Sequence, residues 1–323
     1  GDSKWLENKD LKKVGLFNED GVVLSMQNTA KVKLTETPRG IGIRYLKKGK
    51  LIVDNSNTHV AVCAPTRGGK GIGTIIPTLL YWQSSVICYD MKRENFDLTS
   101  GFRSLFSTVV KVDFLRKGSS KWNPLEEIRI DTEYEVTDAQ IIAQQLMNPD
   151  EDKKSDFWLN TSIKVFSALV LYLINNLDEE EKSIRAIISI LTSRQSSYET
   201  KTDIERLVTL LSEFVEYDTG KKEINRIITD NLMAFIAMSE SEKQFIGVKD
   251  SILEQLNIYS NPIVAENISF SDFSVTDIMD SEKPVSLYYC VTAGQDRKLL
   301  NPLTKLFFTM FVTKKVHSLK KSK

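Results

Sequence analysis

Hydrophobic residues change their spacing along the chain, and the change separates strand patterns from helix patterns. Mostly apolar runs without strict alternation occupy Thr58 to Cys63, Ser85 to Asp90 and Thr108 to Phe114. Continuous rather than alternating runs are typical of parallel strands that are covered on both faces. The spacing from Lys70 to Tyr81, between the first two runs, predicts a helix. This stretch therefore predicts a mostly parallel sheet with helices.

Helical spacing dominates the middle of the chain. A strand pattern returns in "EKPVSLYYCVTAG", and a helix pattern follows it from Lys298 to Lys315. Because strand patterns lie on both sides of the helical stretch, we expect an all-helical domain inserted into an α/β domain. The predicted helices are Val136 to Met147, Asp156 to Leu177, Ile184 to Thr192, Asp203 to Glu216, Lys222 to Met238 and Ser241 to Tyr259.

These patterns also set the expected domain boundaries. Residues 1–57 mix polar turns with short strand patterns and form a β-rich lead-in. Residues 58–134 form the first part of the α/β domain and residues 269–323 its second, incomplete part. Residues 135–268 form the inserted all-α domain.

Composition is that of an ordinary folded protein, with 323 residues, 41% hydrophobic and 27% charged. The longest apolar run, Val165 to Ile174, is about half as long as the ~20 residues that span a membrane. We therefore expect no transmembrane segment and no signal peptide in this sequence.

Cysteine and histidine are too few and too scattered to indicate a metal site. Cys63, Cys88 and Cys290 each lie in a short apolar run, so we expect three reduced cysteines buried in core strands. The only two histidines, His59 and His317, exclude a histidine-based metal site and a histidine-containing triad.

Charge is balanced overall but unevenly distributed. The segment from Glu135 to Glu266 holds 23 acidic and 13 basic residues, a net charge of −10, and the rest of the chain carries +10. A DNA-binding surface is expected to be basic, so the acidic segment favours protein partners, unless its charge serves only solubility. The basic residues near the end, Lys314 and Lys315 among them, are expected to face solvent, nucleotide, neighbouring subunits or anionic lipid.

A glycine-rich stretch, "AVCAPTRGGKGIGT" from Ala61 to Thr74, follows the first predicted strand and opens the first helix. It resembles the phosphate loop G-x-x-x-x-G-K-[ST], with Ala64 at the first glycine and Gly71 at the hydroxyl position. Amides at a helix N-terminus favour anions, which supports phosphate binding through Lys70. The alternative is a glycine-rich turn with a solvated lysine. The candidate binding residues are Thr66, Arg67, Gly68, Gly69, Lys70, Gly71 and Ile72.

A second candidate lies at the end of the next strand, in "YDMKREN". Carboxylates at the C-terminal end of a parallel strand lie on the ligand side of an α/β sheet. Asp90 and Glu94 are therefore candidates to position Mg²⁺ or water, with Lys92 near the phosphates, and Arg93 is expected in a solvated turn. A metal at the loop would otherwise be held by Thr66, Thr74 or water. No catalytic residue is predicted.

Together these motifs resemble the VirD4/TraG coupling ATPases of type IV secretion systems. The resemblance rests on "APTRGGKGIGTIIPTLL" and "SVICYDMKRENFDLTSGFR", and then in order on "KWNPLEEI", "DFWLNTSIKVFSALVLYLI" and "SDFSVTDIMDSEKPVSLYYCV". The opening "GDSKWLENKDLKKVGL" is similar to the segment that follows the membrane anchor of the family. The family's own loop commonly has glycine after lysine.

The resemblance implies a RecA-like P-loop NTPase domain that binds ATP and Mg²⁺, with an inserted all-α domain that selects substrate or binds an adaptor or regulator. It further implies a homo-hexamer at the cytoplasmic face of the bacterial inner membrane. Such a protein delivers protein effectors or DNA–protein complexes to other secretion-system subunits.

The sequence departs from the family pattern at several positions. Met91 and Arg93 replace the proline and glycine of an Asp-Pro-Lys-Gly-Glu motif, and Gly68 stands where serine is common. The family's Walker B strand is expected after the helix that here ends in "TKKVHSLKKSK", and no candidate for it is present. We therefore expect a fragment without anchor or Walker B motif that hydrolyses little ATP.

Two other functions remain open. One is a nucleotide-binding, hydrolysis-incompetent scaffold whose helical domain binds proteins. The other is a P-loop kinase acting on a small molecule, for which the sequence offers no acceptor site.

Overall fold

The computed structural model describes residues 13, 15–16, 21–27, 32–37, 40–45, 50–56, 59–63, 65, 68–148, 156–176, 178, 181–192, 202–291 and 294–321. The chain divides into two compact units. Unit 1 comprises Gly1–Val112 and Asp280–Ala293, and unit 2 comprises Asp113–Met279 and Gly294–Lys323.

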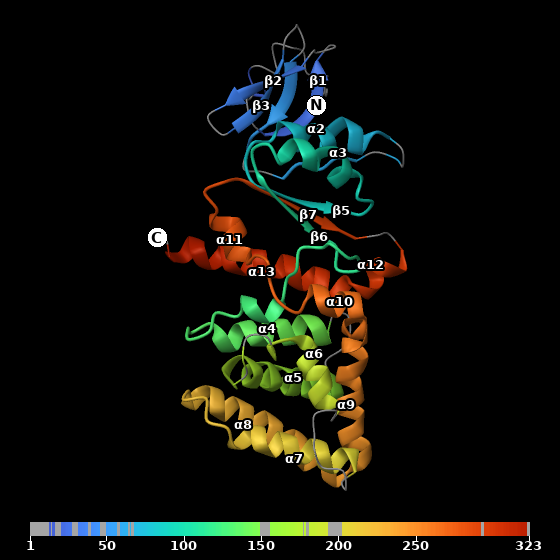
Figure 1. The fold of residues 1–323 in the computed structure, drawn as a ribbon, viewed down its shortest axis with the longest axis vertical. Helices are drawn as coiled ribbons and strands as arrows, with labels where there is room; N and C mark the ends of the chain where they lie inside the picture. Colours follow the sequence, from blue (N-terminus) through green and yellow to red (C-terminus); the bar gives the residue numbers. More distant parts are fainter. Residues whose placement is uncertain are drawn as a thin grey trace, which may run out of the picture. The chain divides into compact units, whose positions relative to one another are not determined.

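Unit 1 begins with two antiparallel strand pairs, as the β-rich pattern of the lead-in predicts (Figure 1). β1 (Val22–Gln27) pairs with β4 (Lys50–Asp54), and β2 (Val32–Thr37) pairs with β3 (Gly40–Tyr45). The backbone N–H of Val23 in β1 donates to the Thr78 hydroxyl at 3.0 Å, and Thr78 belongs to α2 (Ile76–Tyr81). This bond fixes the first strand pair to the helix that follows the glycine-rich loop.

A parallel three-stranded sheet forms the centre of unit 1, with the order β5-β7-β6. β5 (Val86–Asp90) and β6 (Thr108–Val112) both pair in parallel with β7 (Val285–Cys290). The strand patterns before and after the helical stretch therefore join in one sheet, as predicted. α3 (Glu94–Arg103) packs against all three strands, and α2 packs against α3.

The expected strand from Thr58 to Cys63 is wrong for the part that the structure describes, because residues 59–63 form no strand. Val60 and Val62 instead line a cavity of about 580 Å³ with Ile87 and Tyr89 of β5, and Val62 stays 45% exposed. A strand requires a partner that completes its hydrogen bonds, and no ladder joins this segment to the described sheet. Thr58 lies outside the described residues.

Two of the three cysteines are buried, as predicted, and the third is not. Cys88 and Cys290 lie in the core between sheet and helices, together with Leu79 and Tyr288. Burial, with the Asp90 carboxylate nearby, raises the pKa of the Cys88 thiol to about 12. Cys63 is exposed, since its segment is not a core strand. The prediction of three buried cysteines is therefore wrong at Cys63.

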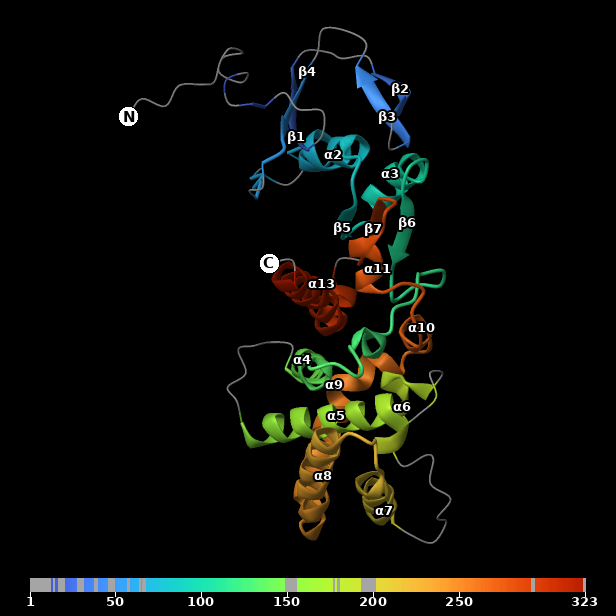
Figure 2. The same ribbon diagram turned by 90° about the vertical axis from the view of Figure 1, so that its left-hand side faces the viewer.

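Unit 2 is largely helical, and the predicted helices of the middle stretch are confirmed within a few residues at each end (Figure 2). Their observed bounds are α4 (Glu135–Met147), α5 (Phe157–Asn176), α6 (Ile184–Leu191), α7 (Asp203–Glu216), α8 (Lys222–Ala237) and α9 (Glu242–Leu256). α5 is the central helix of this group, since it packs against α4, α8 and α9. The last predicted helix is longer than expected, as α13 (Asn301–Lys321).

By length and composition, α5 alone among the described helices is apolar enough to cross a membrane. Of its apolar window, 67% is buried inside the protein. That burial is the pattern of a core helix, whose apolar residues pack against neighbouring helices.

Several short elements were not predicted. They are η2 (Pro124–Glu127), η4 (Met238–Glu240), α10 (Pro262–Asn267), α11 (Val275–Asp280) and α12 (Gln295–Leu299). The 3-10 helix η5 (Asn257–Ser260) overlaps the end of the predicted helix Ser241 to Tyr259. η2 lies in the "KWNPLEEI" motif, where the buried Asn123 side chain accepts from the Leu125 N–H and donates to the carbonyls of Lys182 and Ser269. This asparagine therefore joins three separate segments of unit 2.

Candidate functional site

The glycine-rich loop ends in a tight turn at the start of a helix. Gly69 has φ +76°, a left-handed conformation that disfavours residues with a Cβ atom. The N–H of Gly68 donates to the Pro65 carbonyl at 2.9 Å, and Lys70 Nζ donates to the same carbonyl at 3.1 Å. Gly68 and Gly69 are exposed. The backbone of this turn is therefore accessible to a ligand.

The first turn of the following helix is a π-helix, η1 (Gly71–Ile75), which continues directly into α2. The prediction of a helix from Lys70 to Tyr81 is thus confirmed, with an unexpected first turn. A Cβ atom at Gly71 would meet no other atom within 4 Å. Crowding therefore does not explain why a glycine takes the usual hydroxyl position.

The structure describes most of the predicted loop residues. Gly68, Gly69, Lys70, Gly71 and Ile72 surround the turn, with Ile72 79% exposed. Thr66 and Arg67 lie outside the described residues. Since Lys70 immediately precedes η1, its amide and those after it lie at a helix N-terminus, where anions are favoured.

Asp90, predicted to position metal or water, caps α3 in this structure. Its carboxylate is 2% exposed and accepts from the Phe96 N–H at 2.8 Å and the Lys92 N–H at 3.4 Å. Lys92 and Glu94 are exposed beside it. Asp90 therefore has a clear structural role, the fixing of the turn between β5 and α3.

Arg93, the residue before α3, has a left-handed backbone with φ 64° and ψ 0°. Its side chain is partly buried, so the expectation of a solvated turn is wrong. A left-handed conformation costs an L-residue roughly 1–2 kcal/mol, which glycine avoids. The glycine expected here from the family motif thus matches the backbone that the turn adopts.

This conformation predicts an unusual order of stability for two substitutions of Arg93. Arg93→Gly and Arg93→Ala both remove the side chain, but only alanine retains the left-handed penalty. We expect Arg93→Gly to have a free energy of unfolding about 1 kcal/mol above that of Arg93→Ala, measured by denaturant unfolding. Equal stabilities, or a more stable alanine variant, would show that the turn is not left-handed.

Arg103, at the end of α3, connects the elements around the loop. Its guanidinium is fully buried and donates to the carbonyls of Leu79, Trp82 and Ser84 and to the Ser286 hydroxyl, at 2.5 to 2.8 Å. It thereby ties the end of α2 to β7. No sequence pattern signals this role, because a lone arginine in a helix is usually exposed.

No group of three or more His, Cys, Asp or Glu side chains that could hold a metal ion occurs among the described residues. The glycine turn fits a phosphate group better than a metal, since it offers amides and a lysine rather than carboxylates. The candidate site is therefore an anion site at the start of η1.

The chain matches the family described as type IV secretory system conjugative DNA transfer over residues 4–322. It belongs to this family. It is 29% identical over 320 residues to conjugal transfer protein TraG from Escherichia coli, across 97% of this chain and 48% of the relative. A second TraG from the same species is 30% identical over 320 residues.

Protein VirD4 from Rhizobium radiobacter is 29% identical over 272 residues, across 82% of this chain and 36% of VirD4. The resemblance to the VirD4/TraG family is thereby confirmed. The chain spans about half the length of the TraG relatives, or less in the case of VirD4. The parallel sheet and its helices are consistent with a fold of the P-loop NTPase type.

Proposed function

We propose that this chain is the nucleotide-binding and substrate-recruiting part of a type IV secretion coupling protein. In this proposal residues 58–134 and 269–323 belong to a RecA-like domain, and residues 135–268 form an inserted all-α domain. ATP with Mg²⁺ binds at the glycine loop. The observation that carries the proposal is the exposed turn Gly68–Gly69 followed by Lys70 at a helix start, in a member of the conjugative DNA transfer family.

The loop residues have distinct tasks in phosphate binding. The left-handed Gly69 lets the backbone approach the ligand closely, and the amides at the start of η1 face the negative charge. When phosphate binds, the Lys70 ammonium releases the Pro65 carbonyl and donates a charge-assisted hydrogen bond to a phosphate oxygen instead. Bound ATP supplies the phosphoanhydride whose cleavage drives transport. Arg103 and Asp90 keep the surrounding helices in place.

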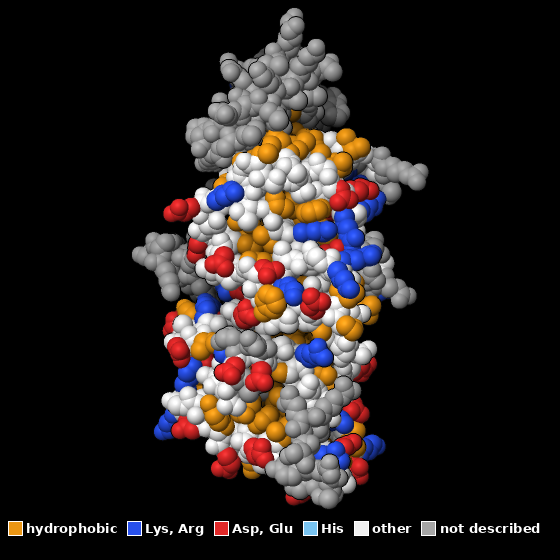
Figure 3. Space-filling model, in the orientation of Figure 1, with side chains coloured by type: hydrophobic (Ala, Val, Ile, Leu, Met, Phe, Trp, Pro, Cys, Tyr) orange, Lys and Arg blue, Asp and Glu red, His pale blue; other side chains and the backbone are white. Residues whose placement is uncertain are grey.

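We propose that the helical domain recruits protein effectors or the protein part of DNA–protein complexes, directly or through an adaptor or regulator. Its net charge of −10 does not favour direct DNA contact. On the face that Figure 3 shows, acidic and basic side chains are interspersed rather than gathered in one acidic patch. We therefore expect the domain to recognise a partner at a small site rather than through one large acidic surface. We place the whole protein as a homo-hexamer at the cytoplasmic face of the inner membrane, with other secretion-system subunits.

Removal of the loop lysine tests the nucleotide site. Lys70→Ala is expected to weaken binding of ATP·Mg²⁺ about tenfold or more, because hydrogen bonds to charged groups contribute about 1.5–3 kcal/mol. Isothermal titration calorimetry on the full chain measures the affinity. Lys283→Ala, which alters an exposed lysine of the same unit, is the matched control and should bind as the native chain does.

A native chain that binds no ATP, or a Lys70→Ala variant with unchanged affinity, would contradict the nucleotide site. Phosphate release shows whether this chain alone hydrolyses the ATP that it binds. The described residues offer no acidic metal cluster, so we expect the chain alone to release little phosphate. Robust release that Lys70→Ala abolishes would show that the chain alone is a complete ATPase.

A further inference from the structure

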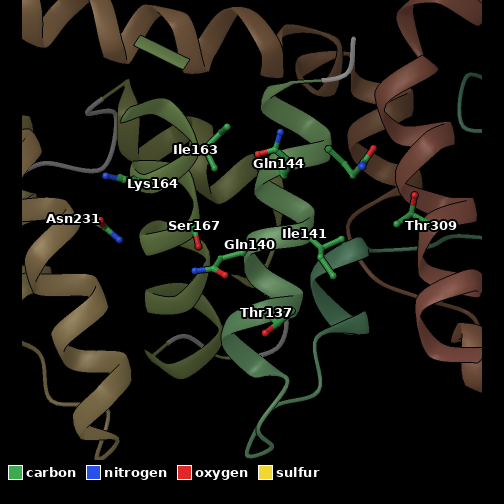
Figure 4. Close-up of a pocket in the computed structure, with 10 residues that line it drawn as sticks. Thr137, Gln140, Ile141, Gln144, Ile163, Lys164, Ser167, Asn231 and Thr309 are labelled. Atoms are coloured by element: carbon green, nitrogen blue, oxygen red, sulfur yellow. The ribbon is translucent and has the colours of Figure 1, made fainter. Parts of the chain in front are cut away.

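A pocket of about 470 Å³ opens among the helices of unit 2, within the range of about 300–1,000 Å³ that ligand pockets occupy. Figure 4 shows its lining residues on four helices. Gln140 and Gln144 lie on α4, Lys164 and Ser167 on α5, and Asn231 and Thr309 on α8 and α13.

The pocket is lined by one buried hydroxyl that has no hydrogen-bond partner in the described structure. Ser167 is 3% exposed, and its Oγ has no hydrogen-bond partner among the described residues. Such a buried hydroxyl normally finds a partner, because leaving it without one costs about 1–3 kcal/mol. A ligand that enters the pocket could supply the missing bond.

Among the described residues that line the pocket, one is charged, the exposed Lys164. Lys164 forms no ion pair with any described residue, and the described residues that line the pocket include no Asp or Glu. This differs from the segment around it, whose net charge is −10. The pocket therefore favours one negative group within an otherwise acidic domain.

We propose that this pocket binds an extended polypeptide segment that carries one carboxylate. Lys164 pairs with the carboxylate, and the amides of Gln140, Gln144 and Asn231 offer both donors and acceptors to a peptide backbone. The Ser167 hydroxyl completes its own hydrogen bonding on the same segment. A nucleic acid would need several cations to neutralise its phosphates, and the described lining of this pocket supplies one.

The inference deepens the proposed recruitment of proteins and rests on it, but its test is independent of nucleotide. The probe is the peptide acetyl-Ser-Gln-Ser-Ala with a free C-terminal carboxylate, compared with the same peptide as its C-terminal amide. Titration into the isotope-labelled full chain, followed by NMR, reports the Asn and Gln side-chain amides of the pocket.

We expect saturable shifts of the Gln140, Gln144 and Asn231 amides with the free carboxylate, and about fivefold weaker binding of the amidated peptide. Lys164→Gln should bring the two peptides to equal affinity. Lys243→Gln, an exposed lysine of α9 outside the pocket, should leave the difference unchanged.

Absence of shifts, equal affinity of both peptides for the native chain, or an equal effect of Lys243→Gln would overturn the proposal. So would a single-stranded oligonucleotide that shifts the same amides at lower concentration than the peptide. If ATP binding depends on Lys70 but the peptide titration fails, the proposal for this pocket is wrong and the proposed nucleotide site still stands.

Discussion

Replacing Arg103 with methionine is expected to lower the free energy of unfolding of unit 1 by about 3–5 kcal/mol. The buried guanidinium donates to three backbone carbonyls and one hydroxyl. Methionine fills similar space but donates no hydrogen bond. Each buried acceptor that loses its donor costs about 1–3 kcal/mol. The carbonyls of Trp82 and Ser84 can bind water instead, because these two residues are only partly buried, so the total is smaller than the sum over all four acceptors. Guanidinium unfolding followed by circular dichroism measures the change.

Two further variants show whether the loss of stability comes from the hydrogen bonds of the planar guanidinium, from its charge, or from any substitution in this unit. Arg103→Lys retains the charge but not the planar fork, so it should lose most of the same stability. Lys283→Met changes an exposed residue of unit 1 and should shift stability by less than about 0.5 kcal/mol. An Arg103→Lys variant as stable as the native chain would show that charge alone matters. Since Arg103 holds the end of α2, the methionine variant should also bind ATP more weakly.

The sequence predicted those elements whose signal is local. Long helices such as α5 and α9 show helical spacing over many residues, and β5, β6 and β7 are mostly apolar runs. The family motifs located the glycine loop, which the structure places at a helix start. Even the glycine of the family's second motif indicated a backbone feature, the left-handed turn at Arg93.

The features that the sequence could not reveal depend on residues far apart in the chain. The segment 59–63 has the apolar pattern of a strand, but strand formation depends on a partner that its own residues do not specify. Arg103 acquires its role from carbonyls 19 to 24 positions earlier and from Ser286, 183 positions later. Asp90 appeared as a metal candidate, because a carboxylate at a strand end serves equally as a helix cap.

The role of Lys314 also depends on a residue far away in the sequence, and it leads to the second prediction of a large loss of stability. Lys314 was expected at a solvated or ligand-facing basic end, but its side chain is 12% exposed and its ammonium pairs with Glu127, whose side chain is 1% exposed. Glu127 also accepts from Trp122 Nε1 and from the Val275 N–H, both at 2.8 Å. One carboxylate thus joins η2, α11 and α13 within unit 2.

Replacing Glu127 with glutamine is therefore expected to lower the free energy of unfolding of unit 2 by about 3–5 kcal/mol, as when one partner of a buried ion pair is removed. Glutamine retains the shape and one acceptor oxygen, but it leaves the Lys314 ammonium without a counter-charge in a poorly solvated position. Thermal unfolding followed by near-ultraviolet circular dichroism reports the loss through Trp122, which is fully buried and lies 4.9 Å from the Phe307 ring.

Two matched variants decide whether the ion pair is the cause. Glu254→Gln removes an exposed carboxylate from α9 of the same unit and should change stability by less than about 0.5 kcal/mol. Lys314→Met combined with Glu127→Gln removes both charges, so it should be more stable than Glu127→Gln alone, since no ammonium is then left buried without a partner. A double variant less stable than Glu127→Gln would contradict this account. Lys314 would then stabilise the unit even without its counter-charge.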